Sequence, residues 1–246
     1  MIDTRISVVI PAYNEEKRLG ECLSHLAKQQ ERPDEIIVVD NDSTDATTLI
    51  AKSCGVRVVR EKQRGMIFAR NRGFNEAYFP IIARTDADCL PPPEWIKIIK
   101  HDFATGDIDG LTGPVIFYDL PFRTAIFDTL YLNFVKLLQS SKETLQGPNM
   151  IITRSMWKRV KHDVCLTDKQ VHEDVDLAIH ILAAHGVIRR NPRLIMCSSG
   201  RRIVSNPQSF FGEYTIRFFN TFRIHAQKKI NRPSADGKVT EAHLTS

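Results

Sequence analysis

The sequence predicts an α/β fold in which a single domain holds a mostly parallel central sheet flanked by helices. In the N-terminal part of the chain, short apolar runs alternate with amphipathic segments, which is the pattern of parallel strands joined by crossover helices. The length of 246 residues suits one large α/β domain. With 42% hydrophobic and 26% charged residues, the chain has the composition of a globular protein with a substantial core.

Four strands separated by three helices are predicted first. The first strand is an apolar run that stops at Pro11, and Gly55 ends the second helix. Residues 43–45 are suitable caps for that helix, because their side chains can accept hydrogen bonds from its first backbone N–H groups. The predicted strands are residues 6–10, 35–40, 56–59 and 81–84, and the predicted helices are about 15–30, 43–53 and 66–77.

The second half is less regular. Strands are predicted at residues 111–117, 150–153 and 194–197, and helices at 122–139 and 174–185, the latter ended by Gly186. In the helix at 122–139, one side carries Phe122, Ile126, Leu130, Phe134, Leu137 and Leu138, and Phe127, Tyr131 and Val135 broaden that apolar stripe. We expect a nucleotide-binding half at about 1–110, a second half at about 111–232 and a polar flexible tail at 233–246.

The net charge of +5 is partly concentrated late in the chain. Such basic groups suit phosphates, nucleic acid or an anionic lipid surface, or form a solvated face. No nucleic-acid-binding motif accompanies them, so we expect no nucleic-acid partner. The clustered residues are Arg189, Arg190, Arg193, Arg201 and Arg202, followed by Arg217, Arg223, Lys228 and Lys229.

The five cysteines are odd in number, and no pair has CxxC spacing. We therefore expect neither a disulfide framework nor a zinc site, and a reducing cytoplasm. No apolar run reaches the ~18 residues of a membrane-spanning helix. The N-terminus also lacks the layout of a signal peptide.

Carboxylates follow the ends of two predicted strands. Ligands of open α/β sheets bind beyond the carboxyl ends of their strands. Asp40 ends one strand, and Asp86 and Asp88 follow another with no basic residue in the next few positions. Unpaired, Asp86 and Asp88 would repel each other, and a hard divalent cation would relieve that cost. The alternatives are helix capping for Asp40, although Asp40 comes too early for that role, and an ordinary acidic turn at 86–88.

Two further groups are ambiguous by themselves. Arg70 lies between Gly65 and Gly73, where it could pair with a phosphate or lie solvated on a helix face. Residues 173–176 place three carboxylates at the start of a helix. Acids favour that position through the helix dipole, but one of them could also be a general base.

Taken in order, the stretches 8–16, 36–45, 69–71, 85–88 and 173–174 resemble the family 2 glycosyltransferases. The similarity extends over about residues 5–180. It implies the GT-A fold and an inverting, single-displacement transfer of a sugar from a nucleotide-diphosphate sugar to a hydroxyl acceptor. Because the processive-synthase motif Q-x-x-R-W is absent, we expect transfer of one sugar at a time.

The resemblance also implies roles for individual residues. Asp88, together with Asp86, would hold Mn²⁺ or Mg²⁺ on the diphosphate, and Asp174 would be the catalytic base. A third metal ligand stays open among His180, His185 and His225. The nucleotide donor would contact Pro11, Ala12, Tyr13, Glu15, Asp40, Asp42, Arg70, Asp86, Ala87, Arg201 and Arg202, although the two last arginines fit a solvated surface equally well.

The chain departs from the family at Asn41 and Asp42, where the common pattern has Asp and Gly. The acceptor is not specified. The aromatic segment 210–223 has basic neighbours, which suits either an interfacial helix with a lipid-linked acceptor, such as a cell-envelope glycan precursor, or core packing. Rival functions are a non-catalytic sugar-nucleotide-binding module and a nucleotidyltransferase.

Overall fold

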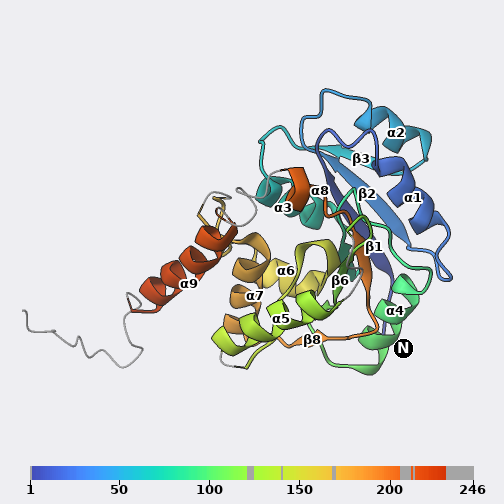
Figure 1. Cartoon of the computed structure of the whole chain (residues 1–246). Coiled ribbons are helices and arrows are strands. Elements are labelled where there is room, and N and C mark those ends of the chain that lie inside the picture. Colours follow the sequence, from blue (N-terminus) through green and yellow to red (C-terminus); the bar gives the residue numbers. More distant parts are fainter. Residues whose placement is uncertain are drawn as a thin grey trace, which may run out of the picture.

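The computed structural model describes residues 2–120, 125–139, 141–167, 170–205, 212 and 214–230. Its centre is a seven-stranded sheet of order β3-β2-β1-β4-β7-β5-β8, beside a two-stranded sheet of β6 and β9 (Figure 1). The strands are β1 (Ile6–Ala12), β2 (Glu35–Asp40), β3 (Arg57–Arg60), β4 (Ile81–Arg84), β5 (Gly110–Thr112), β6 (Val115–Phe117), β7 (Met150–Thr153), β8 (Ile188–Arg190) and β9 (Met196–Ser198).

The prediction of a mostly parallel sheet is confirmed. Strands β1 to β4 are parallel to their neighbours, and β5 is parallel to β8. Strand β7 is the exception, because it runs antiparallel between β4 and β5. The carboxyl ends of β1, β2 and β4 therefore meet at one edge of the sheet, where a ligand site is expected.

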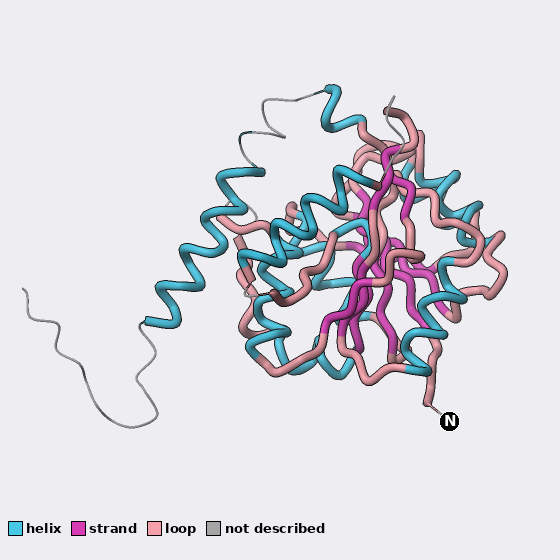
Figure 2. Tube along the Cα trace, turned by 60° about the horizontal axis from the view of Figure 1, so that its bottom comes forward, coloured by secondary structure: helices cyan, strands magenta, loops and turns pink. Residues whose placement is uncertain are grey.

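Helices cover both faces of the sheet, which runs through the middle of the molecule (Figure 2). One face packs against α1, α2 and α4, and the other against α3, α6 and α7. Helices α5 and α9 pack beside α7 around a small separate core. The bounds are α1 (Leu19–Ala27), α2 (Thr47–Ser53), α3 (Met66–Glu76), α4 (Trp95–Thr105), α5 (Ile126–Leu138), α6 (Arg154–Val160), α7 (Glu173–Ala183), α8 (Arg201–Ser205) and α9 (Tyr214–Ile230).

Strand β1 is buried along its whole length, with side chains that alternate between the two layers. Val8 belongs to the core under α1 and α4, whereas Val9 belongs to the core under α3. Gly73 allows α3 to approach β1 closely, since a Cβ atom at this position would lie 2.2 Å from Val9 Cγ1. This spacing positions α3 beside the carboxyl end of the sheet.

Several predicted boundaries in this part of the chain are wrong. Strand β1 continues through Pro11 to Ala12, and α2 begins at Thr47 rather than at residue 43. The first helix begins at Leu19, because the backbone N–H of Glu15 is bound by Thr47 Oγ1 at 2.7 Å and the chain makes a turn before the helix. The strand predicted at 111–117 is two strands in two sheets. They are separated at Gly113, where a Cβ would lie 2.0 Å from the carbonyl oxygen of Leu194, and at Pro114, which has no N–H for a sheet ladder.

The C-terminal part differs more. In α5, most of the predicted apolar stripe faces outward: Leu130 is 60% and Leu137 is 72% exposed, whereas Leu132 and Val135 are buried. Helix α7 ends at Ala183, and its left-handed residue is His185 (φ 61°) rather than Gly186. Residues 122–124 of the predicted helix, 210–211 of the aromatic segment and the tail at 233–246 lie outside the described residues.

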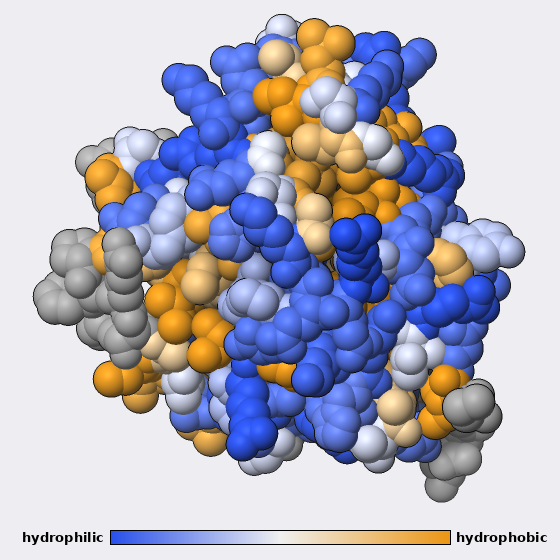
Figure 3. Space-filling view, turned by 90° about the vertical axis from the view of Figure 1, so that its right-hand side faces the viewer, coloured by the Kyte–Doolittle hydropathy of each residue, from blue (hydrophilic) through white to orange (hydrophobic). Residues whose placement is uncertain are grey.

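The surface on the side of α1, α2 and α4 is mainly hydrophilic, with an apolar area in its upper half (Figure 3). None of the five cysteines forms a disulfide in the structure. Within the described ranges, no helix combines the length and the apolar character needed to cross a bilayer.

Candidate active site

A cleft opens at the carboxyl ends of β1, β2 and β4. Its walls come from the last residues of β1, the segments that follow β1, β2 and β4, the loop before α3 and the first turn of α3. This placement results from the parallel register, which brings the three strand ends to one edge. The lining residues are Pro11, Ala12, Tyr13, Glu15, Asn41, Arg64, Gly65, Met66, Ala69, Asp86, Ala87 and Asp88.

Asn41 organises one wall of the cleft. Its side-chain amide donates to the carbonyl oxygens of Glu61 and Gln63 at 3.1 and 2.7 Å, and its Oδ1 accepts from the backbone N–H of Gly65 at 2.9 Å. Gly65 has φ 143°, a conformation that favours glycine. The loop before α3 is thereby fixed against the end of β2.

The fixed loop presents Arg64 to the cleft. The Arg64 guanidinium lies over the Tyr13 ring, 3.3 Å from its centroid, and Nη1 donates to the Asp42 carbonyl at 3.1 Å. Tyr13 is 42% exposed, so a flat ring and a cation are both available at the cleft surface. Such a pair can contact a base by stacking and a phosphate by charge.

The acidic turn after β4 differs from the prediction, because both carboxylates have cationic partners. Asp86 Oδ1 lies 2.7 Å from Arg84 Nη2, and Asp88 Oδ2 lies 3.1 Å from Arg201 Nε. The sequence analysis considered basic residues only in the positions just after Asp88. Arg84 lies before the turn and Arg201 lies in α8, so neither partner was found there. Arg201 also pairs with Glu15, which connects three segments across the cleft.

The donor atoms of this turn nevertheless fit a hard divalent cation. Asp86 and Asp88 both line the cleft, and carboxylate oxygens are the ligands that Mg²⁺ and Mn²⁺ favour. Mg²⁺ typically takes one or two carboxylates and fills its remaining positions with phosphate oxygens and water. The sequence prediction of a metal at these two residues is compatible with this donor set.

Arg84 connects this turn to the start of α7. Its side chain is buried, and it pairs with Glu173 as well as with Asp86. Burial opposes the charged form of Arg84, but Asp86, Glu173 and Asp174 together raise its pKa. Arg70 is also buried and donates to Glu173 Oε2 at 2.7 Å. A cationic pair therefore holds Glu173, and Arg70 does not line the cleft.

Asp174 lies at the N-terminus of α7 and is buried. One oxygen contacts His172 Nδ1, and the other accepts from the backbone N–H of Gly147 at 2.9 Å. Burial opposes ionisation of Asp174, but His172, Gly147 and Arg84 hold the pKa of this carboxyl well below its ordinary value. Burial likewise opposes the charged form of His172, and Asp174 raises its pKa. Asp174 is not among the residues that line the cleft.

Three other predicted contact residues lie at the rim or outside the description. Asp40 is buried, and its Oδ1 accepts from the backbone N–H of Ser43 at 3.1 Å, which is a turn role. Asp42 has φ 63°, the position where the family pattern has glycine, and pairs with Arg60 at 2.6 Å. The Arg202 side chain lies outside the described part of the structure.

Sequence reasoning missed three residues of this region: Asn41, Arg64 and Arg84. Asn41 was noted only as a departure from the family pattern. Arg84 was detectable in principle, because an arginine that ends a buried strand needs a partner for its charge. Of the histidines considered as a third metal ligand, His180 and His225 meet Asp176 and Cys165 instead, and His185 is exposed.

Comparisons with known proteins agree with this geometry. Residues 7–165 match the sequence model of the family described as glycosyl transferase family 2. The glycosyltransferase AglE of Haloferax volcanii is 33% identical over 120 residues, which cover 46% of this chain and 40% of that protein. The dolichol-phosphate mannosyltransferase of Pyrococcus furiosus is 39% identical over 103 residues, which cover 39% of this chain and 29% of that protein. The matched region thus spans less than half the length of these relatives.

The fold also matches solved structures. A mannosyltransferase of Pyrobaculum calidifontis, solved with GDP-mannose and Mn²⁺, superimposes with a TM-score of 0.61 at 22% identity. The superposition covers 79% of this chain and 56% of that protein. At this level of identity the likeness concerns the fold, which is GT-A.

Proposed function

The chain belongs to glycosyl transferase family 2, and we propose that it transfers one sugar from a nucleoside-diphosphate sugar to a hydroxyl acceptor with inversion. The observation that supports this proposal most is the cleft, which combines the Asp86–Asp88 turn with the Tyr13–Arg64 pair at the carboxyl ends of parallel strands. We further propose that residues 1–110 bind the donor and residues 111–232 the acceptor.

In this proposal the nucleoside lies on the β1 side of the cleft. Tyr13 offers a ring face for the base, and Pro11, Ala12 and Ala87 form the adjacent surface. Glu15 Oε2 is buried and has no hydrogen-bond partner among the described residues, so it is available to a donor group of the nucleoside. Asp40 acts indirectly, because it holds the turn before Ser43 rather than lining the cleft.

Asp88 and Asp86 would hold the divalent ion, which neutralises charge that gathers on the departing diphosphate. Arg64 and Arg201 bring two further cations to the same cleft. Arg201 pairs with both Glu15 and Asp88, so it stands between the proposed nucleoside and diphosphate positions. These charges are arranged before the donor arrives, which reduces the reorganisation that bond cleavage requires.

We assign the base role to Asp174. The acceptor oxygen attacks the anomeric carbon, the bond from that carbon to the phosphate oxygen breaks, and its electron pair leaves with the nucleoside diphosphate. The acceptor proton passes to the Asp174 carboxylate. Support comes from the chain of contacts that runs from Asp86 through Arg84 to Glu173, the neighbour of Asp174.

A lipid-linked acceptor is the finer proposal for the second substrate. Helices α5 and α9 expose apolar side chains, and the stacked rings of Phe134 and Phe218 hold the two helices together. The Pyrococcus relative is named for a lipid-phosphate acceptor. Sedimentation with anionic vesicles tests this: Leu137→Ser should weaken binding, whereas Leu49→Ser on the distant α2 should not. Full activity on a soluble acceptor without vesicle binding would exclude it.

The donor proposal is tested by a thermal-shift screen of UDP, GDP and dTDP sugars with and without Mn²⁺. A ligand that binds the native state raises its stability, by about 2.7 kcal/mol at 100 times the dissociation constant. We expect one nucleotide to raise the melting temperature in a Mn²⁺-dependent manner.

Asp88→Asn should abolish that rise, and the matched variant Asp107→Asn, which changes an exposed acid away from the cleft lining, should preserve it. If no nucleotide raises the melting temperature with any metal, or if Asp88→Asn responds like the parent protein, the proposed donor site is wrong.

A further inference from the structure

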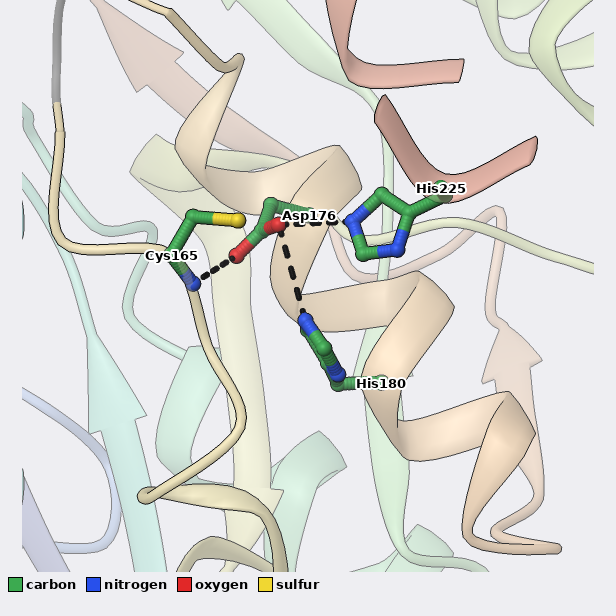
Figure 4. Close-up of side chains that lie close together, drawn as sticks. All are labelled: Cys165, Asp176, His180 and His225. Carbon is green, nitrogen blue, oxygen red and sulfur yellow. Dashed lines mark hydrogen bonds and ion pairs between the residues drawn. The ribbon is translucent and has the colours of Figure 1, made fainter. Parts of the chain in front are cut away.

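Four potential metal ligands converge on the side of α7 that faces α9 (Figure 4). Asp176 and His180 come from α7, His225 comes from α9, and Cys165 lies in the segment that follows α6. Their candidate ligand atoms all lie within 4.8 Å of one another. None of the four lines the cleft, so the cluster is separate from the proposed nucleotide site.

The arrangement of these side chains follows from helix geometry. Asp176 and His180 are four residues apart and therefore project from the same face of α7. His225 Nε2 lies 2.8 Å and His180 Nε2 lies 3.7 Å from Asp176 Oδ1. The two imidazole rings are 4.8 Å apart between centroids. Figure 4 shows both rings directed at the same carboxylate.

These separations are close to those of a tetrahedral zinc centre. Zinc binds nitrogen, oxygen and sulfur ligands at about 2.0–2.3 Å, which places neighbouring ligand atoms roughly 3.3–3.8 Å apart. The His180 contact already lies in that range, and the His225–Asp176 hydrogen bond would open by about half an ångström. The ligand atoms of the whole group lie within 4.8 Å of one another, so the widest separation would have to close by up to about 1 Å on metal binding.

The types of ligand atom in the cluster also favour zinc over magnesium or calcium. One thiolate, two imidazoles and one carboxylate suit Zn²⁺, whereas Mg²⁺ and Ca²⁺ favour oxygen ligands throughout. The Asp176 side chain is only 1% exposed and each histidine 13%, so the ligands are largely removed from water. Four protein ligands leave no open position, which is the pattern of structural rather than catalytic zinc.

We propose that Cys165, Asp176, His180 and His225 form a structural zinc site that fastens α9 to α7. Apart from this cluster, α9 contacts the body through an apolar core in which Phe218 packs against Val135 and Val175, and Thr221 Oγ1 accepts from the backbone N–H of His172 at 2.8 Å. The metal would add a further attachment at His225, about two helical turns after Phe218. Binding releases the Cys165 thiol proton and any proton shared between His225 and Asp176, so affinity should rise with pH.

A metal-free network is the competing explanation. His225 is hydrogen-bonded to Asp176 Oδ1, and the backbone N–H of Cys165 donates to Oδ2 at 3.0 Å, so the carboxylate is satisfied without a cation. In the network the Cys165 side chain also interacts with Asp176, as a protonated thiol. The two explanations therefore differ in whether Cys165 Sγ is a thiol beside the carboxylate or a thiolate bound to a metal. A test should therefore detect sulfur–metal bonding directly.

The test uses the purified full chain, freed of metal with a chelator and titrated with Co²⁺ as a spectroscopic substitute for zinc. We expect a near-ultraviolet thiolate-to-cobalt band and intense visible bands typical of tetrahedral Co²⁺, with one equivalent of Zn²⁺ displacing both. Elemental analysis of the protein loaded with zinc should give one zinc per chain.

Variants assign the signal to these residues. Cys165→Ser and His225→Gln should each abolish the thiolate band, and His225→Gln keeps a hydrogen-bond donor for Asp176. The matched controls Cys54→Ser and His162→Gln change exposed residues elsewhere and should keep the band. Asp88→Asn should keep it as well, which distinguishes this site from the acidic turn of the cleft.

Stability gives a second readout. Zinc at about 100 times its dissociation constant should raise the melting temperature of the parent protein by roughly 5 °C or more, and should not raise that of His225→Gln. Absence of stoichiometric zinc in the parent protein, or a cobalt spectrum unchanged by Cys165→Ser, would overturn the proposal in favour of the metal-free network.

Discussion

Arg84 joins two acidic groups that have opposite surroundings. On one side, Asp86 and Asp88 line an open cleft, where their carboxylates can reach a ligand. On the other side, Glu173 and Asp174 are held by buried or partly buried partners, among them Arg70 and His172. The comparison shows that acidic spacing alone does not separate a ligand-binding carboxylate from an internally paired one. The partners decide the role, and they come from distant parts of the chain.

The largest expected effect tests whether the α7 group is only structural. Asp174→Asn should lower turnover by about 10²–10⁴-fold, the usual contribution of a general base, while nucleotide binding is kept. Steady-state rates and donor titrations measure the two quantities. Asp163→Asn, at an exposed position, is the control. Unchanged turnover would mean that Asp174 only holds His172 and Gly147. A protein without turnover in any form would instead be a binding module.

The link that Arg84 forms between Asp86 and Glu173 is tested by measuring the free energy of unfolding. Arg84→Met should destabilise the protein by about 3–5 kcal/mol, because it removes the cation that pairs with Asp86 and one of the two buried cations that pair with Glu173. Arg72→Met is the matched control, since Arg72 is 45% exposed and its i,i+4 pair with Glu76 is worth only about 0.5 kcal/mol. Urea unfolding measures both. Equal losses in the two variants would show that Arg84 does not carry the link.

A smaller effect concerns pH and the His172–Asp174 pair. The lowered pKa of Asp174 gives stability that is present above its unfolded value of about 3.9 and lost on acidification. The raised pKa of His172 gives stability that is present below its unfolded value of about 6.5 and lost as the pH rises through the folded value. Both contributions coexist between about pH 4 and 6.5.

His172→Gln should therefore cost most in that window, about 1.5–3 kcal/mol, and less at higher pH. Urea unfolding at a series of pH values measures the difference, with the exposed His162→Gln as control. A cost that is constant from pH 4 to 9 would show that the pair is not ionic.

The sequence predicted the structure best where a buried element is one continuous run of apolar residues. The strands at Glu35–Asp40, Ile81–Arg84 and Met150–Thr153 have the predicted bounds, because a strand buried on both faces is one continuous apolar run. The same reasoning could not show that β7 runs antiparallel, since pairing direction depends on the topology of the whole chain. Seven of the residues proposed from the resemblance line the cleft. They lie at or just after the ends of β1 and β4, two strands that are apolar runs in the sequence.

Other features depend on contacts across the fold. Periodicity predicted the apolar side of α5, but it could not show that most of this side faces outward, because periodicity does not indicate what covers an apolar face. The pairing of Asp88 with Arg201 joins positions far apart in the sequence. The same holds for the group of Cys165, Asp176, His180 and His225, which has no recognisable spacing and arises only when α9 lies beside α7.

The close approach of α3 to β1 at Gly73 affects the cleft at the other end of this helix. Helix α3 presents Met66 and Ala69 to the cleft from one end, while its other end rests against Val9 of β1. A Cβ at Gly73 would force this end of α3 away from β1 and so shift the residues that α3 contributes to the proposed nucleotide site. The absence of a Cβ at Gly73 thus helps to determine the shape of the cleft.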